Sequence, residues 1–181
     1  AMFAGCASTA QTAAQTAETT AEDASAAAEG EASAPAASGA EDHIIRIGAI
    51  CAMTGGSAIY GEGAQNAVDM AVEEINASDS EYKVEIVNGG KVADDAKDAK
   101  QAMNAYNKVM ADAPEALIGS FFSAVTLPMA EQAAKDGMLL LATGATNSAV
   151  TQKGETIFRN CFIDPYQGKM AALFVKSKGI S

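Results

Sequence analysis

Two short clusters of small and hydroxyl residues are the parts of this sequence best suited to binding chemistry. Residues 119–124 read GSFFSA and residues 142–147 read ATGATN, and each cluster follows an apolar run. Hydroxyl groups and free backbone amides at strand ends and helix starts can hold an anion without a cationic side chain. We therefore expect these clusters to bind a small anion, most simply the carboxylate of an amino acid.

The elements around the clusters predict how they are brought together. The apolar runs at residues 116–118 and 138–141 have the length of buried strands, and residues 124–135 between them have a helical pattern. A strand–helix–strand unit of this kind is almost always right-handed, with parallel strands. Both clusters then lie at the carboxyl ends of neighbouring strands, where open α/β sheets bind their ligands.

The rest of the chain continues the alternation of strands and helices. Further strands are expected at residues 44–50, 82–87 and 156–162, and further helices at about 60–76, 94–110 and 165–178. Asp164 and Pro165 look like the N-cap and first position of the last helix. The pattern predicts an α/β fold, a three-layer parallel sheet with flanking helices.

Three acids, Asp94, Asp95 and Asp98, fall at the expected start of the second helix. Acids are favoured in a first helical turn because they interact well with the helix dipole. We interpret this group as a solvated helix start. A calcium loop would need its ligands at other spacings and a later glutamate.

Composition excludes several classes of function. The formal net charge of −11 argues against a nucleic-acid surface, which needs a basic patch. One histidine and three cysteines without a CxxC spacing make a metal site improbable, and no apolar run has the length of a membrane span. G-x-G-x-x-G, P-loop and G-x-S-x-G motifs are absent, so we predict no cofactor and no catalytic residue.

Residues 7–42 differ from everything that follows. Residues 1–42 hold seven of the 23 acids and none of the 12 lysines and arginines, and Leu, Ile, Val and aromatic residues are absent from residues 7–42. Such a segment buries too little apolar surface to offset the entropy lost on ordering. We predict a disordered acidic linker.

The first residues carry one more signal. Residues 1–6 read AMFAGC, and small residues before Cys6 with a polar spacer after it resemble the end of a bacterial lipoprotein signal peptide. Cys6 would then be acylated and would anchor the protein to the cell membrane. The alternative interpretation is an ordinary free thiol.

A series of ordered motifs resembles a known family. The motifs are IGA at residue 47, MTG at 53, YGEG at 60, AVEEIN at 71, LIGS at 117, ATGATN at 142 and FR…DPYQG from 158. Together they resemble the branched-chain amino-acid (Leu/Ile/Val) binding proteins of ABC transporters, which have the type I periplasmic binding protein fold. The resemblance covers residues 44–178.

The resemblance implies roles for individual residues. Ser123 would bind the ligand carboxylate, Ala145 and Thr146 would add backbone and hydroxyl contacts, and Tyr60 would face the ligand side chain. Considered alone, the residues leave other interpretations open. Ser123 could simply cap the third helix, Tyr60 could be an ordinary loop aromatic, and residues 146–147 could form only a turn. Cys51 and Cys161 could be buried free thiols or a disulfide.

The family fold has two lobes that close over the ligand, and its members are longer than this chain. We therefore expect residues 43–163 to form an incomplete N-terminal lobe. Residues 164–181 would be the first helix of a truncated second lobe. The contacts that the second lobe supplies to the ligand would not be in this sequence.

The resemblance implies an extracytoplasmic solute-binding protein. It would capture an amino acid, most simply a branched-chain one, and deliver it to the transmembrane subunits of an ABC permease. A ligand-sensing domain of a receptor or signalling system is the alternative, as is a binding protein for another small carboxylate or amide.

Overall fold

The computed structural model describes residues 43–180, all of which follow the expected linker. The predictions made for residues 7–42 and for Cys6 lie outside the described residues.

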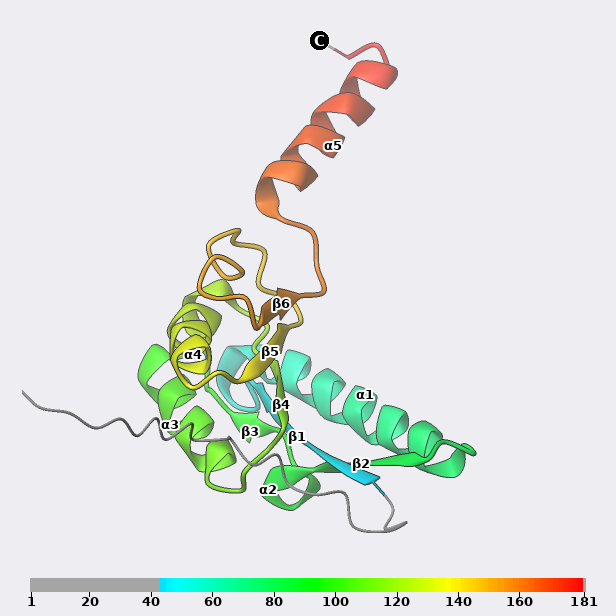
Figure 1. Cartoon of the computed structure of the whole chain (residues 1–181). Helices are drawn as coiled ribbons and strands as arrows, with labels where there is room; N and C mark the ends of the chain where they lie inside the picture. The colour runs from blue at the N-terminus through cyan, green and yellow to red at the C-terminus, as the bar shows by residue number, and fades with distance from the viewer. Residues whose placement is uncertain (1–42, 181) are drawn as a thin grey trace, which may run out of the picture. The chain divides into compact units, whose positions relative to one another are not determined.

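The elements alternate largely as the sequence predicts (Figure 1). In chain order they are β1 (His43–Cys51), η1 (Gly55–Ser57), α1 (Ala58–Ala77), β2 (Tyr82–Ile86), α2 (Val87–Gly90), β3 (Ala93–Asp94), α3 (Ala99–Met110), β4 (Ala116–Gly119), α4 (Ser123–Lys135), β5 (Leu139–Ala142), β6 (Ile157–Arg159) and α5 (Asp164–Ser177). The four-residue α2 holds Asn88 and Gly89 at φ 60° and 65°, so it is a turn rather than a regular helix.

The strands form one parallel sheet in the order β2-β1-β4-β5-β6, with the short β3 beside the end of β1. The chain runs outward from β1 to β2 on one side, and outward from β4 through β5 to β6 on the other. The strand order therefore reverses between β1 and β4, and such a switch point is where open α/β sheets form a ligand crevice. The predicted fold class is confirmed.

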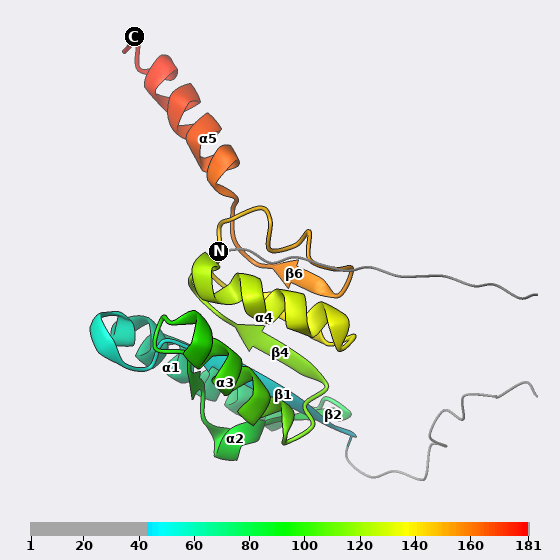
Figure 2. The ribbon, with the colours of Figure 1, turned by 90° about the vertical axis from the view of Figure 1, so that its left-hand side faces the viewer.

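The helices form a layer on each face of the sheet (Figures 1 and 2). Helices α3 and α4 lie side by side on one face. Their core includes Tyr106, Met129, Leu117 and Leu140, each no more than 1% exposed. Helix α1 packs on the other face through an apolar stripe that includes Val68.

The face that carries α1 is only partly covered. Helix α1 lies against β1 and β2, where Ala49 and Ile86 are buried. Further along the same face, Leu139 of β5 and Phe158 of β6 are 43% and 50% exposed. Leu141, which is paired with Phe158, is half-buried. An apolar strip of sheet thus faces outward beyond α1.

The structure corrects the predicted start of the second helix. Helix α3 begins at Ala99, and Asp98 is its N-cap, accepting hydrogen bonds from the amides of Lys100 and Gln101 at 3.0 and 2.9 Å. Asp94 instead belongs to β3, and Asp95 is fully buried. Residues 96 and 97 have positive φ, which interrupts any helix before Asp98.

Helix α5 has none of its residues buried, and its apolar side chains, including Leu173 and Phe174, are 49% and 63% exposed. The predicted N-cap is wrong by one position. Ile163 occupies it in extended conformation, and Asp164 is the first helical residue. Acid and proline still lie in the first turn, where the dipole and the fixed φ of proline favour them.

Candidate functional site

The candidate site lies at the carboxyl edge of the sheet, where β1, β4 and β5 end close together. Ile50 pairs with Gly119, and Ile118 pairs with Leu141, so the loops after these strands start at a common level. Gly119 has φ +125°, and a Cβ there would collide with the carbonyl of Ile50. Glycine is therefore needed where the chain leaves β4 toward the predicted binding cluster.

Ser123 is the first residue of α4 and does not cap it. The N-cap position is Phe122, without a side-chain capping bond, so the capping interpretation of Ser123 is wrong. The Ser123 hydroxyl instead accepts a hydrogen bond from the amide of Asn147 at 3.2 Å. That contact joins the two predicted clusters, and it leaves the hydroxyl proton and the free amides of the first helical turn available to an anion.

Ala145 and Thr146 lie in the loop that follows β5. Ala145 is fully buried, and its carbonyl accepts a hydrogen bond from Arg159 at 3.4 Å. Thr146 is half-buried, and its carbonyl accepts from the amide of Asp164 at 3.3 Å. Within residues 43–180 the amides of Ala145 and Thr146 donate no hydrogen bond. Asn147 does form a turn, since its side chain accepts from the amide of Ala149 at 2.9 Å.

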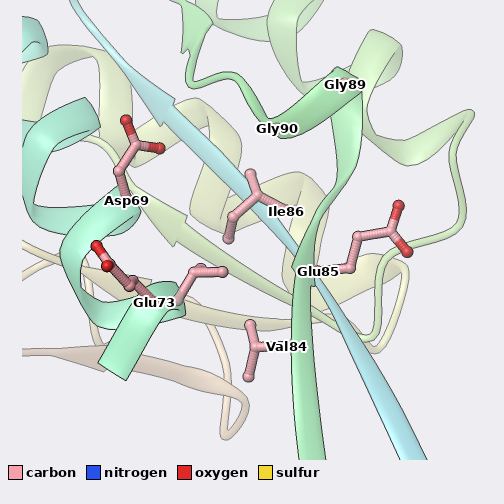
Figure 3. Close-up of a pocket in the computed structure, with 8 residues that line it drawn as sticks. Asp69, Glu73, Val84, Glu85, Ile86, Gly89 and Gly90 are labelled. Atoms are coloured by element: carbon pink, nitrogen blue, oxygen red, sulfur yellow. The ribbon is translucent and has the colours of Figure 1, made fainter. Parts of the chain in front are cut away.

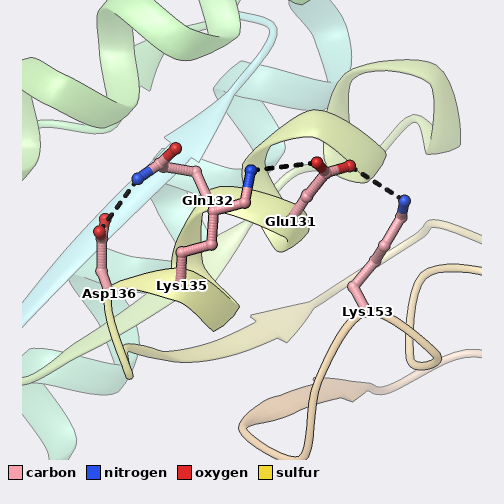
Figure 4. Close-up of polar contacts among 5 residues, drawn as sticks. All are labelled: Glu131, Gln132, Lys135, Asp136 and Lys153. Carbon is pink, nitrogen blue, oxygen red and sulfur yellow. Dashed lines mark hydrogen bonds and ion pairs between the residues drawn. The ribbon is translucent and has the colours of Figure 1, made fainter. Parts of the chain in front are cut away.

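Side chains that the sequence did not single out hold this loop in place. Arg159 of β6 donates to the carbonyl of Asn147 at 2.7 Å and to the hydroxyl of Thr151 at 2.8 Å. Figure 4 shows the second attachment, in which Lys153 of the loop reaches Glu131 of α4 at 3.1 Å. The hydrogen bonds from Lys135 and Lys153 lower the pKa of the Glu131 carboxyl.

Tyr60 belongs to an aromatic cluster, which we define as Tyr60, Phe121 and Phe122. The Tyr60 ring stacks on Phe121 at 4.5 Å between centroids and meets Phe122 edge-on at 5.5 Å, while the two phenylalanines lie 5.2 Å apart. Tyr60 lies in the first turn of α1 and is 45% exposed, so it is not an isolated loop aromatic. The sequence placed both phenylalanines in the first cluster without giving them a role.

Asp94 and Asp95, which lie before α3 and not in its first turn, also belong to this edge. The carboxylate of Asp94 accepts from the Met53 amide at 2.8 Å and from the Thr54 hydroxyl at 2.6 Å. Burial alone would raise the pKa of Asp94, but the hydrogen bonds from Thr54 and from backbone amides outweigh it and lower the pKa. The buried Asp95 accepts a hydrogen bond from the Ser120 hydroxyl. These acids brace the loops around the site.

Cys51 and Cys161 are free thiols, so the disulfide interpretation is wrong. Cys51 is buried at the end of β1, and burial, together with the charges of Asp95 and Asp94, raises the pKa of its thiol. A buried thiol with a raised pKa is a packing residue rather than a nucleophile.

An apolar groove of about 560 Å³ runs along α1 and reaches the candidate site, because Tyr60, Phe121 and Thr143 are among the residues that line it. A second hollow, of about 410 Å³, lies between α1 and β2. Figure 3 shows Asp69 and Glu73 on α1, whereas the Glu85 side chain of β2 is directed away from them.

In the described part of the chain no group of acids, cysteines and histidine could hold a metal ion. None of the helices formed by these residues combines the length and the hydrophobicity of a membrane span.

A family model described as periplasmic binding protein matches residues 44–179, which is nearly all of the described chain. The chain belongs to the periplasmic binding protein family. Members of this family are solute-binding proteins. The resemblance noted in the sequence is therefore confirmed.

Individual members show how closely the family matches. Leu/Ile/Val-binding protein homolog 1 of Brucella abortus is 35% identical over 128 residues, covering 68% of this chain and 33% of the relative. The crystal structure of the leucine-binding protein LivK from Thermotoga maritima matches with a TM-score of 0.62 at 30% identity, over 72% of this chain and 36% of that one. LivJ from Streptococcus pneumoniae, solved with isoleucine, matches with 0.66 at 27%, over 75% and 38%.

This chain thus spans about a third of the length of the curated relatives that it matches. The shared part contains the carboxyl edge of the sheet and every residue that the sequence singled out for ligand binding.

Proposed function

We propose that this chain forms one lobe of an extracytoplasmic solute-binding protein, which captures an amino acid for an ABC transporter. A branched-chain amino acid is the ligand that best fits the relatives, since the reported relative from Brucella abortus is named a Leu/Ile/Val-binding protein homolog and LivJ was solved with isoleucine. The observation that carries the proposal is the contact between Ser123 and Asn147, because it gathers the neutral donors of two strand ends at one point.

In this proposal the carboxylate lies against the N-terminus of α4. The Ser123 hydroxyl donates to one carboxylate oxygen, and the first amides of α4 complete the contact. The amides of Ala145 and Thr146, and the Thr146 hydroxyl, approach from the loop after β5. No cation is required, because several neutral donors and the positive end of a helix share the charge.

The aromatic cluster would receive the ligand side chain. Tyr60 has the exposed surface needed for this contact, and Phe121 and Phe122 support it from behind. Aromatic surfaces pack well against aliphatic groups and lose little side-chain entropy on binding. A ligand with an apolar side chain therefore fits this edge better than a polar or charged one.

We propose further that residues 43–163 are the first lobe and residues 164–181 the start of a second. The uncovered strip at Leu139 and Phe158, the groove beside α1 and the exposed apolar side of α5 support this division. In a longer protein, later segments would cover the strip and a second sheet would cover α5. The ammonium of the ligand would be bound by that second lobe.

The route to the membrane is proposed from the first residues. Acylation of Cys6 would tether the lobe through the acidic segment 7–42, beside the transmembrane subunits of the permease. Mass spectrometry of the protein from its native host tests this step. Diacylglycerol on Cys6 is the expected result, and a mature protein that keeps residues 1–5 would contradict it.

Calorimetric titration of the full-length gene product with leucine, isoleucine and valine tests the ligand. We expect binding of at least one of them, and Ser123→Ala to weaken it about tenfold, since a hydrogen bond to a charged group contributes about 1.5–3 kcal/mol. Ser177→Ala is the matched control, because its hydroxyl donates to the Phe174 carbonyl in α5. Absence of heat with all three would reject the branched-chain assignment.

The alternative proposal is a ligand-sensing domain, which would bind a similar small molecule at the same edge. The coding sequence around this segment separates the two. A neighbouring permease operon favours transport, and a kinase or cyclase domain in the same chain favours sensing.

A further inference from the structure

The loop between β3 and α3 has an unusual backbone. Ala96 and Lys97 both have positive φ, at 47° and 55°, a region that residues with a Cβ rarely adopt. Two carboxylates hold this conformation. The amide of Ala96 donates to Asp94 at 2.8 Å, and the amide of Lys97 donates to Asp95 at 2.8 Å. Two consecutive residues in this region persist only where the surroundings fix them, which suggests a role for the loop.

The same two acids tie the loop to the candidate site. Asp95 also accepts from the hydroxyl of Ser120, in the turn between β4 and α4. Asp94 also accepts from Thr54, in the loop after β1. The position of Lys97 is therefore fixed relative to two of the loops that carry the site.

This backbone places the ammonium of Lys97 over an aromatic ring. Its Nζ lies 4.3 Å from the centroid of the Phe122 ring, within the range of a cation–π contact. The ion pairs in the described residues join Lys135 and Lys153 to Glu131, so the Lys97 ammonium has no carboxylate partner among them. The contact with the ring face is the one interaction that this ammonium makes within residues 43–180.

Phe122 passes this restraint on to the aromatic cluster. Its ring meets Phe121 at 71° and Tyr60 at 87°, both in edge geometry. An edge-to-face contact between aromatic rings depends on ring orientation more than an aliphatic contact does, because the positive edge of one ring must point at the negative face of the other. A ring fixed from one side by a cation thus fixes the orientation of its neighbours.

We propose that Lys97 is a positioning residue for recognition of the ligand side chain. Its ammonium fixes Phe122, and Phe122 fixes the rings of Tyr60 and Phe121 against which the side chain packs. The effect is selective for apolar side chains, because Lys97 acts on the aromatic cluster and not on the donors for the carboxylate. This inference rests on the proposed function, since it assigns the aromatic cluster to the ligand.

NMR titration of the 181-residue chain tests the proposal, because it detects the weak binding expected of a single lobe. The ligands are leucine and alanine, which share the carboxylate and ammonium and differ in side-chain size. Lys97→Met keeps the length of the side chain and removes the charge. We expect it to weaken leucine two- to fivefold, the size of an exposed cation–π contact, and to leave alanine unchanged.

Two further variants control the experiment. Lys97→Arg keeps a cation over the ring and should restore leucine binding. Lys100→Met removes a nearby exposed charge that makes no ring contact in the described residues and should bind like the wild type. If Lys97→Met weakens leucine and alanine equally, Lys97 attracts the carboxylate and the proposal is wrong. If Lys97→Met binds both ligands like the wild type, the proposal is also wrong.

The ligand-free spectra separate failure of this inference from failure of the proposed function. If the wild-type chain binds neither amino acid, the proposed function fails for this chain, yet the ring contact can still be measured. Lys97→Met should then shift the ring resonances of Tyr60 and Phe121, which Lys97 does not touch. Unchanged ring resonances would overturn the positioning role whether or not any ligand binds.

Discussion

The two faces of the sheet are covered to different degrees. On the face of α3 and α4, Leu117 and Leu140 are completely buried. On the face of α1, Leu139 and Phe158 are about half exposed, although they lie in the same or neighbouring strands. Consecutive residues of a strand point to opposite faces, so Leu139 and Leu140 sample both environments one residue apart.

The difference follows from the direction in which the chain crosses the sheet. It moves from β1 to β2 in one direction and from β4 to β5 in the other, so right-handed connections place α1 and α4 on opposite faces. Helix α1 covers β1 and β2, and residues 143–156 between β5 and β6 contain no helix. The part of the α1 face at β5 and β6 therefore requires a segment from elsewhere, which we have proposed to be a later part of a longer protein.

A matched pair of truncations in β5 tests this difference between the two faces most directly. Leu140→Ala should lower the free energy of unfolding by about 2–5 kcal/mol, because it leaves a cavity in a closed core. Leu139→Ala should cost less than about 1 kcal/mol, since its side chain already contacts water. Urea denaturation followed by circular dichroism measures both. Equal losses would mean that the two faces are equally packed in solution.

A second prediction concerns the close contact between Gly144 and the Phe121 ring on the α1 face. A Cβ on Gly144 would lie 2.6 Å from the Phe121 ring, so Gly144→Ala must displace that ring. We expect a loss of about 1–3 kcal/mol in unfolding free energy and disturbed ring resonances in the aromatic cluster.

Gly63→Ala is the control for this change. Gly63 lies within α1, and an added Cβ there meets no atom within 4 Å. It should stabilise the chain by about 0.5–1 kcal/mol, since alanine is the better helix former. A stabilising Gly144→Ala would show that the aromatic cluster is loosely packed.

Much of the fold could be predicted from the sequence because its signals are local. Buried parallel strands such as residues 116–119 read as continuous apolar runs, and α1 has an apolar stripe at helical spacing. The strand order and the uncovered strip at Leu139 and Phe158 could not be predicted from such signals. Both depend on which elements lie side by side. The sequence around Leu139 is an apolar run whether the leucine is half exposed or buried.

A third prediction concerns the loop after β5, which carries Ala145 and Thr146 and packs on the face of α3 and α4. Arg159→Met keeps much of the side-chain volume and removes the hydrogen bonds to the loop carbonyls. We expect a loss of about 1 kcal/mol and faster hydrogen exchange at the amides of Val150 and Lys153.

Glu131→Gln is the contrast for this loop. Glu131 is an exposed residue whose ion pairs are screened by solvent, so we expect no measurable change in the unfolding midpoint. A larger loss for Glu131→Gln than for Arg159→Met would show that the surface ion pair, and not the arginine, holds the loop.

The candidate site shows where sequence reasoning stops. The cluster that contains Ser123 could be recognised because small and hydroxyl residues follow a predicted strand, whereas the role of Ser123 itself was implied by the family resemblance. Its contact with Asn147 joins the two clusters, and its role in ligand binding stays a prediction. Asp95 looked like one of three solvated acids at a helix start. Its burial against Ser120 depends on the positive φ of Ala96 and Lys97. Neither residue is a glycine, so the sequence does not predict this backbone conformation.

The smallest expected effect concerns Asp94, whose carboxylate joins the loops after β1 and β3. The pKa of Asp94 is lowered in the folded chain, because hydrogen bonds from Thr54 and from backbone amides outweigh its burial. The unfolded chain therefore binds a proton more readily, with a pKa near the usual value of about 3.9. The stabilisation is complete above that value and is lost as the pH falls through the lower, folded pKa.

Asp94→Asn removes this titration. We expect the melting temperature of the wild type to fall more steeply between pH 5 and about pH 2.5 than that of Asp94→Asn. Asp79→Asn replaces an exposed acid that accepts no hydrogen bond from residues 43–180, and should keep the wild-type slope. If Asp94→Asn also keeps that slope, the brace between the loops after β1 and β3 does not persist in solution. The carboxyl edge of the sheet would then be stabilised only by the packing of helices on the two faces.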